Sequence, residues 1–288
     1  MYLNHYKLKE YPFSLTCEEK YFYESSVHRE ALGNMLYAVQ QQKGMVLITG
    51  EVGAGKSFMG TMLCSRLGPG CQTVILQNPP DSKKQLLRSF ARHLGIPTAG
   101  AMDKGVLEEN LQEYLVRMHS RGRLVGLILD EAQDLNQAAL KEIRLIWNWE
   151  QEGRRLVQIV LIGQPELRER LLEPKWEPLR QRIVLSYHLP SLTAEDTTAY
   201  IYHRLRTASE NQEAVEFRPE ALAMIHSATD GIPRLINIVC DNALLVGYVK
   251  GVHCIDPAMV TEVLRDMTCW GLQTSKEEIG AGRSPAGE

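Results

Sequence analysis

Hydrophobic positions along the first two thirds of the chain follow two alternating patterns. Short apolar runs of strand length, such as residues 124–130 and 157–163, are separated by longer segments in which apolar positions recur at helical spacing. These runs lack polar alternation, which is typical of strands that are buried on both faces of a parallel sheet. The expected strands are residues 45–49, 73–77, 124–130, 157–163 and 183–188. The expected helices are residues 27–41, 56–67, 82–94, 106–120 and 136–150. The sequence therefore predicts an α/β fold with helices on both faces of a parallel sheet.

The pattern becomes purely helical after Pro190. Helical spacing covers residues 193–208, 219–228, 233–250 and 257–267, which predicts a small helical domain over residues 191–268. We expect residues 1–43 to form an N-terminal segment that packs on an α/β core of residues 44–190. The last stretch, residues 269–288, is polar and rich in glycine, and we expect it to be disordered.

Bulk composition limits the classes of protein that fit the chain. Its 288 residues carry a formal net charge of -3, so no overall positive field attracts it to nucleic acid or to an anionic membrane. No apolar run approaches the roughly 18 residues that a membrane-spanning helix needs. The six cysteines form no C-x-x-C pair, which argues against a disulfide framework and against structural zinc. We expect a reduced, cytoplasmic protein.

A glycine-rich turn joins the first expected strand to the helix that follows it. Residues 50–57 read GEVGAGKS and fit the phosphate-loop pattern G-x-x-x-x-G-K-[ST] at every fixed position. Glycines allow backbone N–H groups to approach phosphate oxygens, and the N-terminus of the helix adds a favourable dipole. Lys56 would reach the β- and γ-phosphates of a nucleotide, and Ser57 would ligate Mg²⁺. The alternative is a glycine-rich turn with a lysine there by chance, which the strand–helix context disfavours. The expected nucleotide-binding residues of the loop are Gly50, Glu51, Val52, Gly53, Ala54, Gly55, Lys56, Ser57 and Phe58.

Two acidic residues end the expected buried strand at residues 124–130. In a parallel sheet, ligands bind beyond the carboxyl ends of the strands, so Asp130 is expected beside the phosphate loop, where it can hold Mg²⁺. Glu131 follows it and can polarise a water molecule for attack on the γ-phosphate. The alternative is an aspartate that only caps the next turn. Together with the phosphate loop, the pair favours a catalytic site.

The order of the motifs resembles the AAA+ ATPases of the ExeA / general secretion pathway protein A family. The motifs are the phosphate loop, DEAQ at 130–133, GQPEL at 163–167, LRQR at 179–182 and GIPRLIN at 231–237, and the N-terminal MYLNHYKLKEYPFSLT is similar as well. The resemblance covers roughly residues 1–267. It implies an AAA+ core with a C-terminal helical lid, hydrolysis of ATP with Mg²⁺, and a homo-oligomer, either a ring or a filament.

The resemblance also implies roles for single residues. Gln164 lies where the family carries its first sensor of the γ-phosphate, although it could be only a turn residue at the end of a strand. Arg180 and Arg182 lie where an arginine finger would enter the site of a neighbouring subunit, although they could belong to a solvated basic turn. Arg234 resembles the second sensor of the lid, with surface pairing to an acid such as Asp230 as the alternative.

Three functions agree with these motifs. The first is a motor or switch in cell-envelope assembly, namely secretion, pilus formation or polysaccharide export. The second is a DNA-dependent ATPase of the transposition-regulator type. The third, a small-molecule P-loop kinase, is disfavoured because no substrate pocket is evident. For the second function, DNA would follow a basic helix face that is otherwise simply solvated, formed by Lys83, Lys84, Arg88 and Arg92.

The acidic balance and the N-terminal resemblance favour the first function over nucleic-acid binding. Relatives of the secretion type often continue into a membrane span and a wall-binding domain, and this sequence ends after the expected lid. We therefore expect a protein partner of the membrane or envelope to recruit the chain to the inner membrane.

Overall fold

The chain divides into two compact units, and each is described by itself. The computed structural model describes residues 2–16, 18–80, 82–98, 103–209 and 215–269. One unit, the α/β unit, spans residues 26–190. The other, the helical unit, combines residues 1–25 with residues from 191 onward. The chain thus passes from the helical unit into the α/β unit and back again.

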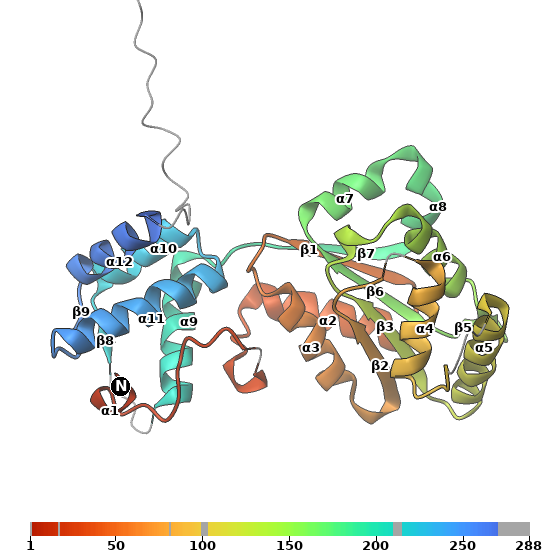
Figure 1. Ribbon diagram of the computed structural model, residues 1–288, viewed down its shortest axis with the longest axis horizontal. Helices are drawn as coiled ribbons and strands as arrows, with labels where there is room; N and C mark the ends of the chain where they lie inside the picture. Colours follow the sequence, from red (N-terminus) through yellow and green to blue (C-terminus); the bar gives the residue numbers. More distant parts are fainter. Residues whose placement is uncertain (1, 17, 81, 99–102, 210–214, 270–288) are drawn as a thin grey trace, which may run out of the picture. The chain divides into compact units, whose positions relative to one another are not determined.

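A five-stranded parallel sheet forms the centre of the α/β unit (Figure 1). Its strand order is β2-β3-β6-β1-β7. The three inner strands are buried along almost their whole length because helices cover both faces, as the unbroken apolar runs indicate. The strands are β1 (Met45–Gly50), β2 (Cys71–Leu76), β3 (Leu124–Leu129), β6 (Gln158–Gly163) and β7 (Ile183–Leu189). The expected α/β fold with a parallel sheet is confirmed.

Two groups of helices cover the two faces of this sheet. Helices α2 (Ser26–Gln40) and α3 (Lys56–Leu67) pack together on one face. Here α3 approaches the sheet at Gly60, where an added Cβ would lie 2.9 Å from Cδ1 of Ile162. Leu161, which precedes Ile162 in β6, belongs to the core cluster on the opposite face. That cluster is completed by α4 (Lys83–His93), α5 (Lys104–Ser120), α6 (Gln137–Trp147) and α7 (Pro165–Leu172).

Several short elements of the α/β unit were not among the expected ones. Each has too few residues to show a period in the sequence. Helix α7, with eight residues, was not predicted either, because its exposed face is strongly polar. The remaining short elements are η2 (Gly68–Gly70), η3 (Ala132–Asp134), the β4 (Glu150–Gln151) and β5 (Arg154–Arg155) hairpin, η4 (Pro174–Trp176) and α8 (Glu177–Arg180).

The helical unit contains the four expected helices. They are α9 (Ala194–Ala208), α10 (Pro219–Thr229), α11 (Pro233–Val249) and α12 (Pro257–Cys269). Proline begins the last three, in a position where its missing N–H costs no hydrogen bond. Between α10 and α11, Gly231 adopts φ 69°, and an added Cβ would lie only 2.0 Å from the carbonyl oxygen of Leu192. A two-residue parallel pairing of β8 (Glu216–Phe217) with β9 (Cys254–Ile255) was not expected.

The N-terminal segment, residues 2–25, belongs to the helical unit, which corrects the expected packing of residues 1–43 on the α/β core. Helix α1 (Tyr2–His5) contacts α11, and η1 (Glu19–Tyr21) contacts α9. Residues 26–43 do lie on the α/β core, because α2 packs against α3 and β7. Of the expected disordered tail, residues 270–288 lie outside the described part of the chain.

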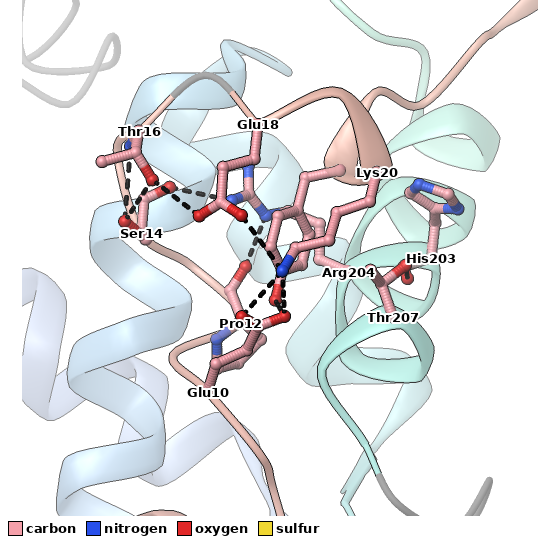
Figure 2. A network of polar contacts seen from close by, with 10 residues as sticks. Glu10, Pro12, Ser14, Thr16, Glu18, Lys20, His203, Arg204 and Thr207 are labelled. Carbon is pink, nitrogen blue, oxygen red and sulfur yellow. Dashed lines mark hydrogen bonds and ion pairs between the residues drawn. The ribbon is translucent and has the colours of Figure 1, made fainter.

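A buried arginine on α9 explains why the N-terminal segment packs in this way (Figure 2). Arg204 donates hydrogen bonds to the carbonyl oxygens of Pro12 and Ser14, and its guanidinium lies 4.7 Å from the ring centroid of Tyr21. These bonds satisfy a charge that would otherwise be buried at high cost. At the surface of the same segment, Lys20 pairs with Glu10 at 2.7 Å and with Glu18 at 3.0 Å.

Candidate nucleotide site

The turn between β1 and α3 has the conformation that the phosphate-loop pattern predicts. Gly53 and Gly55 adopt φ angles of 83° and 95°, in the left-handed region where other residues are strained. Gly50 is required for a different reason, namely space: an added Cβ would lie 2.8 Å from the carbonyl oxygen of Leu189 in β7. Helix α3 then begins at Lys56 and directs its N-terminal N–H groups toward this turn. The loop therefore has the backbone geometry of an anion-binding turn.

The side chain of Lys56 folds back onto the phosphate loop. Its Nζ donates hydrogen bonds of 2.8 Å to the carbonyl oxygens of both Gly50 and Glu51. Burial lowers the pKa of Lys56, while the nearby carboxylates of Glu131 and Asp130 act in the opposite direction. The lysine is thus held as a largely buried cation next to two acids that follow β3.

Ser57 and Asp130 lie together at the carboxyl end of β3. The Ser57 side chain hydrogen-bonds to the carboxyl group of Asp130, which also accepts a 3.0 Å hydrogen bond from the backbone N–H of Glu131. Asp130 is only 4% exposed, and burial raises its pKa against the opposing effect of these hydrogen bonds. A hydroxyl and a carboxylate are ligands that Mg²⁺ accepts, and the ion takes its other ligands from water and phosphates. The pair fits Mg²⁺.

Glu131 begins a tight turn directly after the strand. Its backbone is left-handed, with φ 50° and ψ 41°, and it precedes the short helix η3. Its Oε2 accepts a 2.7 Å hydrogen bond from Nε2 of Gln133. A non-glycine residue with positive φ is uncommon and costs free energy, so the surrounding contacts must hold this turn in place.

Gln133 also reaches the residue that the sequence analysis assigned to the first sensor. Its Oε1 accepts a 3.1 Å hydrogen bond from the backbone N–H of Gln164, at the start of α7. Gln164 therefore lies near Glu131 through one intervening side chain. Sequence reasoning quoted Gln133 in the DEAQ motif but gave it no role, because a side-chain bridge between two loops leaves no period in the sequence.

Comparison with known proteins agrees with this geometry. Residues 39–171 match the AAA domain family. The α/β unit is an AAA domain. The chain is 36% identical to general secretion pathway protein A of Aeromonas hydrophila over 255 residues, which covers 88% of this chain and 46% of that relative. The expected resemblance is thereby confirmed, although the chain spans less than half the length of this relative.

Solved structures share the fold at low sequence identity. The ORC2 protein of Aeropyrum pernix, in ADPNP and ADP complexes, aligns with a TM-score of 0.67 and 16% identity, covering 90% of this chain and 72% of that one. CDC6P of Pyrobaculum aerophilum aligns with a TM-score of 0.68 and 18% identity, covering 88% and 70%. These alignments extend beyond the AAA domain, so the helical unit shares in the likeness of fold.

The two candidate finger arginines lie at the end of the AAA domain, between α7 and β7. Nη1 of Arg180 donates to the carbonyl oxygens of Leu171 and Leu172, at the C-terminal end of α7. Arg182 donates to the carbonyl oxygen of Pro178, and its guanidinium lies 5.4 Å from the ring centroid of Trp147. Burial, together with neighbouring arginines, lowers the pKa of Arg182. Each guanidinium is thus fixed by contacts within its own chain.

The candidate second sensor belongs to the other unit. Arg234 is exposed in the first turn of α11. Its role stays a prediction. In the part of the chain that the structure describes, no helix is both long enough and apolar enough to cross a membrane.

The basic residues of α4 are not equivalent. Lys84 and Arg92 are exposed, one on each end of the helix, with Arg88 half-buried between them. Lys83 instead lies 4.0 Å from the fully buried carboxylate of Glu142 on α6, which Lys104 approaches more closely, at 3.1 Å. Lys83, whose side chain is 41% exposed, is therefore shared between the suggested DNA-binding face and this carboxylate.

Proposed function

We propose that this chain is an Mg²⁺-dependent ATPase that assembles into a homo-oligomer and drives conformational work on a protein partner in cell-envelope assembly. The observation that carries the proposal is the convergence of Lys56, Ser57, Asp130 and Glu131 on one phosphate loop. Lys56 is buried beside both acids, and Ser57 is hydrogen-bonded to Asp130. A structural salt bridge would need neither the two left-handed glycines nor the start of a helix at the same point.

ATP would be bound first by the loop itself. Backbone N–H groups of residues 50–58 and the N-terminus of α3 favour phosphate oxygens. Lys56 would exchange at least one of its carbonyl partners, Gly50 or Glu51, for oxygens of the β- and γ-phosphates. Arg234, in the helical unit, stays a predicted nucleotide-binding residue. Burial makes these charge-assisted hydrogen bonds stronger than they would be in water.

Ser57 and Asp130 would hold the magnesium ion. Bound there, Mg²⁺ neutralises charge on the phosphate oxygens. Asp130 is well suited to this position because its burial raises the pKa of its carboxyl group, so that a nearby cation is needed to offset the cost of its ionised form.

Glu131 would direct the attacking water. It is half-buried, and its Oε2 is held by Gln133, so the carboxylate can accept a proton from water at its other oxygen. Gln164 would contact the γ-phosphate from the adjacent strand end. An arginine of a neighbouring subunit, Arg180 or Arg182, would stabilise the charge of the transition state.

The likeness to general secretion pathway protein A supports a role in secretion. The chain covers only part of that relative. The envelope-assembly partner is therefore a proposal, which rests on the chemistry of the site and on this likeness. Recruitment to the inner membrane would then depend on this partner. A DNA-dependent ATPase is less well supported, because the chain carries a formal net charge of -3 and one of the four basic residues on α4, Lys83, lies beside the carboxylate of Glu142.

Steady-state hydrolysis of ATP tests the proposal. We expect Mg²⁺-dependent turnover that EDTA abolishes and that Glu131→Gln reduces by roughly 10² to 10⁴-fold, the usual contribution of a general base. Glu169→Gln, at an exposed position of α7, is the matched control and should leave turnover unchanged. Duplex DNA should not stimulate the wild type. Stimulation by DNA that fades with salt would replace the envelope role with nucleic-acid binding.

A further inference from the structure

Gln133 hydrogen-bonds to the proposed water-directing residue but does not itself touch the reacting atoms in the reaction described above. We propose that Gln133 is a positioning residue: its side-chain amide fixes Glu131 relative to Gln164 and so couples the orientation of the carboxylate to the adjacent strand end. This inference rests on the proposed function, since it concerns the residue that would direct water.

The amide of Gln133 uses its donor and its acceptor on two different elements. Nε2 donates to Oε2 of Glu131 at 2.7 Å, and Oε1 accepts from the backbone N–H of Gln164 at 3.1 Å. The two ends of the amide cannot be exchanged. A flipped amide would place its NH₂ against the N–H of Gln164 and its oxygen against a carboxylate, and both contacts would be repulsive. The bridge therefore has a single orientation.

The sheet topology explains why this bridge connects these two residues. Strands β3 and β6 are neighbours and parallel, so their carboxyl ends meet at one edge of the sheet. Glu131 follows β3, and Gln164 follows β6. Gln133 crosses from one strand end to the other. It can do so because Gly163 has no side chain: an added Cβ there would lie 2.9 Å from Oε1 of Gln133.

The backbone of Gln133 is tied to the same helix as its side chain. Nη1 of Arg170, on α7, donates to the carbonyl oxygen of Gln133 at 3.3 Å and also to that of Leu135. Gln164 immediately precedes α7. Two separate contacts thus connect η3 with α7, one through a side-chain amide and one through a guanidinium. Such double attachment restricts the position of Gln133 much more than a single hydrogen bond would.

This arrangement matters for Glu131 because that side chain has several rotamers and only a few of them can direct water. Holding one carboxylate oxygen at 2.7 Å selects among these rotamers before the substrate arrives. The other end of the amide is attached to Gln164, the candidate sensor. A displacement of Gln164 would move the amide and with it the carboxylate.

Substitution of Gln133 tests the proposal through a split between kcat and nucleotide affinity. Gln133→Met keeps the volume of the side chain and removes both hydrogen bonds, and Gln133→Glu keeps the shape but replaces the donor by a charge that repels Glu131. For both variants we expect kcat for ATP to fall roughly 10- to 100-fold, as for a misplaced catalytic group, with KM and the Kd of a non-hydrolysable ATP analogue within about twofold of wild type. Gln137→Ala, at an exposed position in the first turn of α6, is the control and should change nothing.

A double-substitution cycle separates positioning from a purely structural role. If Gln133 acts through Glu131, Gln133→Met should cause no further loss of kcat in a Glu131→Gln background. If the losses of kcat in the two single variants multiply in the double variant, the proposal is overturned. It is also overturned if the Gln133 variants lose nucleotide affinity and thermal stability while kcat per folded molecule is unchanged. A normal kcat in both Gln133 variants, alongside a large loss in Glu131→Gln, would overturn only this inference. Wild-type protein that does not hydrolyse ATP, or is indifferent to Glu131→Gln, would overturn the proposed function and this inference with it.

Discussion

The ammonium group of Lys56 donates a 2.8 Å hydrogen bond to the carbonyl oxygen of Gly50, the last residue of β1. The lysine therefore closes the loop that would hold the nucleotide, and its second bond to Glu51 strengthens the closure. Its removal should affect both the shape of the loop and the charge that meets the phosphates.

We therefore predict that Lys56→Ala weakens binding of ATP by roughly 10- to 100-fold. A hydrogen bond to a charged group contributes about 1.5–3 kcal/mol, and 1.4 kcal/mol corresponds to a factor of ten. Isothermal titration calorimetry with a non-hydrolysable analogue measures the change. Lys84→Ala, at an exposed position of α4, should bind like the wild type. An unchanged Kd in Lys56→Ala would remove the lysine from the site.

Asp130 gives a prediction about stability and pH. Burial raises its pKa above the ordinary value of 3.8, so the folded chain holds this proton more tightly than the unfolded chain does. The stability contributed by the protonated group is fully present below that ordinary value and is lost as the pH rises through the folded-state pKa. At neutral pH the ionised carboxyl group is thus a destabilising feature that the function would require.

Asp130→Asn should accordingly raise the melting temperature at pH 7, and the difference from wild type should shrink as the pH falls toward 4. The asparagine Oδ1 can still accept the hydrogen bond from the N–H of Glu131. Thermal unfolding at a series of pH values in the absence of nucleotide measures this. Asp134→Asn, which is exposed on the same turn, serves as control. A lower melting temperature for Asp130→Asn at pH 7 would show that the hydrogen bonds of the carboxylate and the nearby charge of Lys56 outweigh its desolvation.

The sequence was most informative where a local pattern has one physical explanation. The inner strands of the sheet are apolar runs because both of their faces are covered. The phosphate loop needs glycine where the backbone has positive φ, as at Gly53 and Gly55. The contact between Ser57 and Asp130 was predictable as well, because the carboxyl ends of parallel strands lie at the same edge of the sheet.

Contacts between distant parts of the chain were not predictable in this way. The N-terminal segment joins the helical unit through Arg204, which lies about 190 residues from its partners Pro12 and Ser14 and contacts only their backbone carbonyl oxygens. Any residue can offer a carbonyl oxygen, so no pattern of residue types marks such a contact. The bridge made by Gln133 is similar, because one of its partners is the backbone N–H of Gln164.

Gly163 provides a prediction that is independent of the Gln133 variants. An added Cβ would lie 2.8 Å from Cδ2 of Leu167 and 2.9 Å from Oε1 of Gln133, so Gly163→Ala must displace both side chains or the backbone that carries the new methyl group. We expect turnover to fall by roughly tenfold or more while the affinity for the ATP analogue is kept. Gly70→Ala, where an added Cβ meets nothing within 4 Å, is the control. Normal turnover in Gly163→Ala would contradict the prediction that turnover depends on the position of the Gln133 amide.

Arg204 should be important for the stability of the helical unit. Arg204→Met removes the donors to the carbonyl oxygens of Pro12 and Ser14, at about 1–3 kcal/mol for each buried acceptor left without a partner. Amide hydrogen exchange in residues 8–16 should accelerate, with a lower melting temperature. Arg206→Met, exposed on the same helix, should have little effect. Unchanged exchange would mean that the aromatic contacts alone hold the segment.

A mixing experiment tests whether Arg180 or Arg182 acts on a neighbouring subunit. An arginine finger acts in a site that another chain completes, and its loss lowers turnover by roughly 10³-fold or more. We expect Arg180→Ala or Arg182→Ala to lower the ATPase activity of the assembled protein, with nucleotide affinity kept. Mixing the affected variant with Glu131→Gln should restore part of the activity, because the Glu131→Gln chain supplies the arginine and its neighbour supplies an intact Glu131.

The contacts of the two arginines within their own chain supply the controls for this experiment. Arg180 donates to the end of α7, so Arg180→Ala should also lower the melting temperature, whereas a finger role alone would not. Arg168→Ala, at an exposed position of α7, should leave activity unchanged. If neither arginine variant regains activity on mixing, each acts only through its own chain, Arg180 by capping α7 and Arg182 by its contact with Trp147.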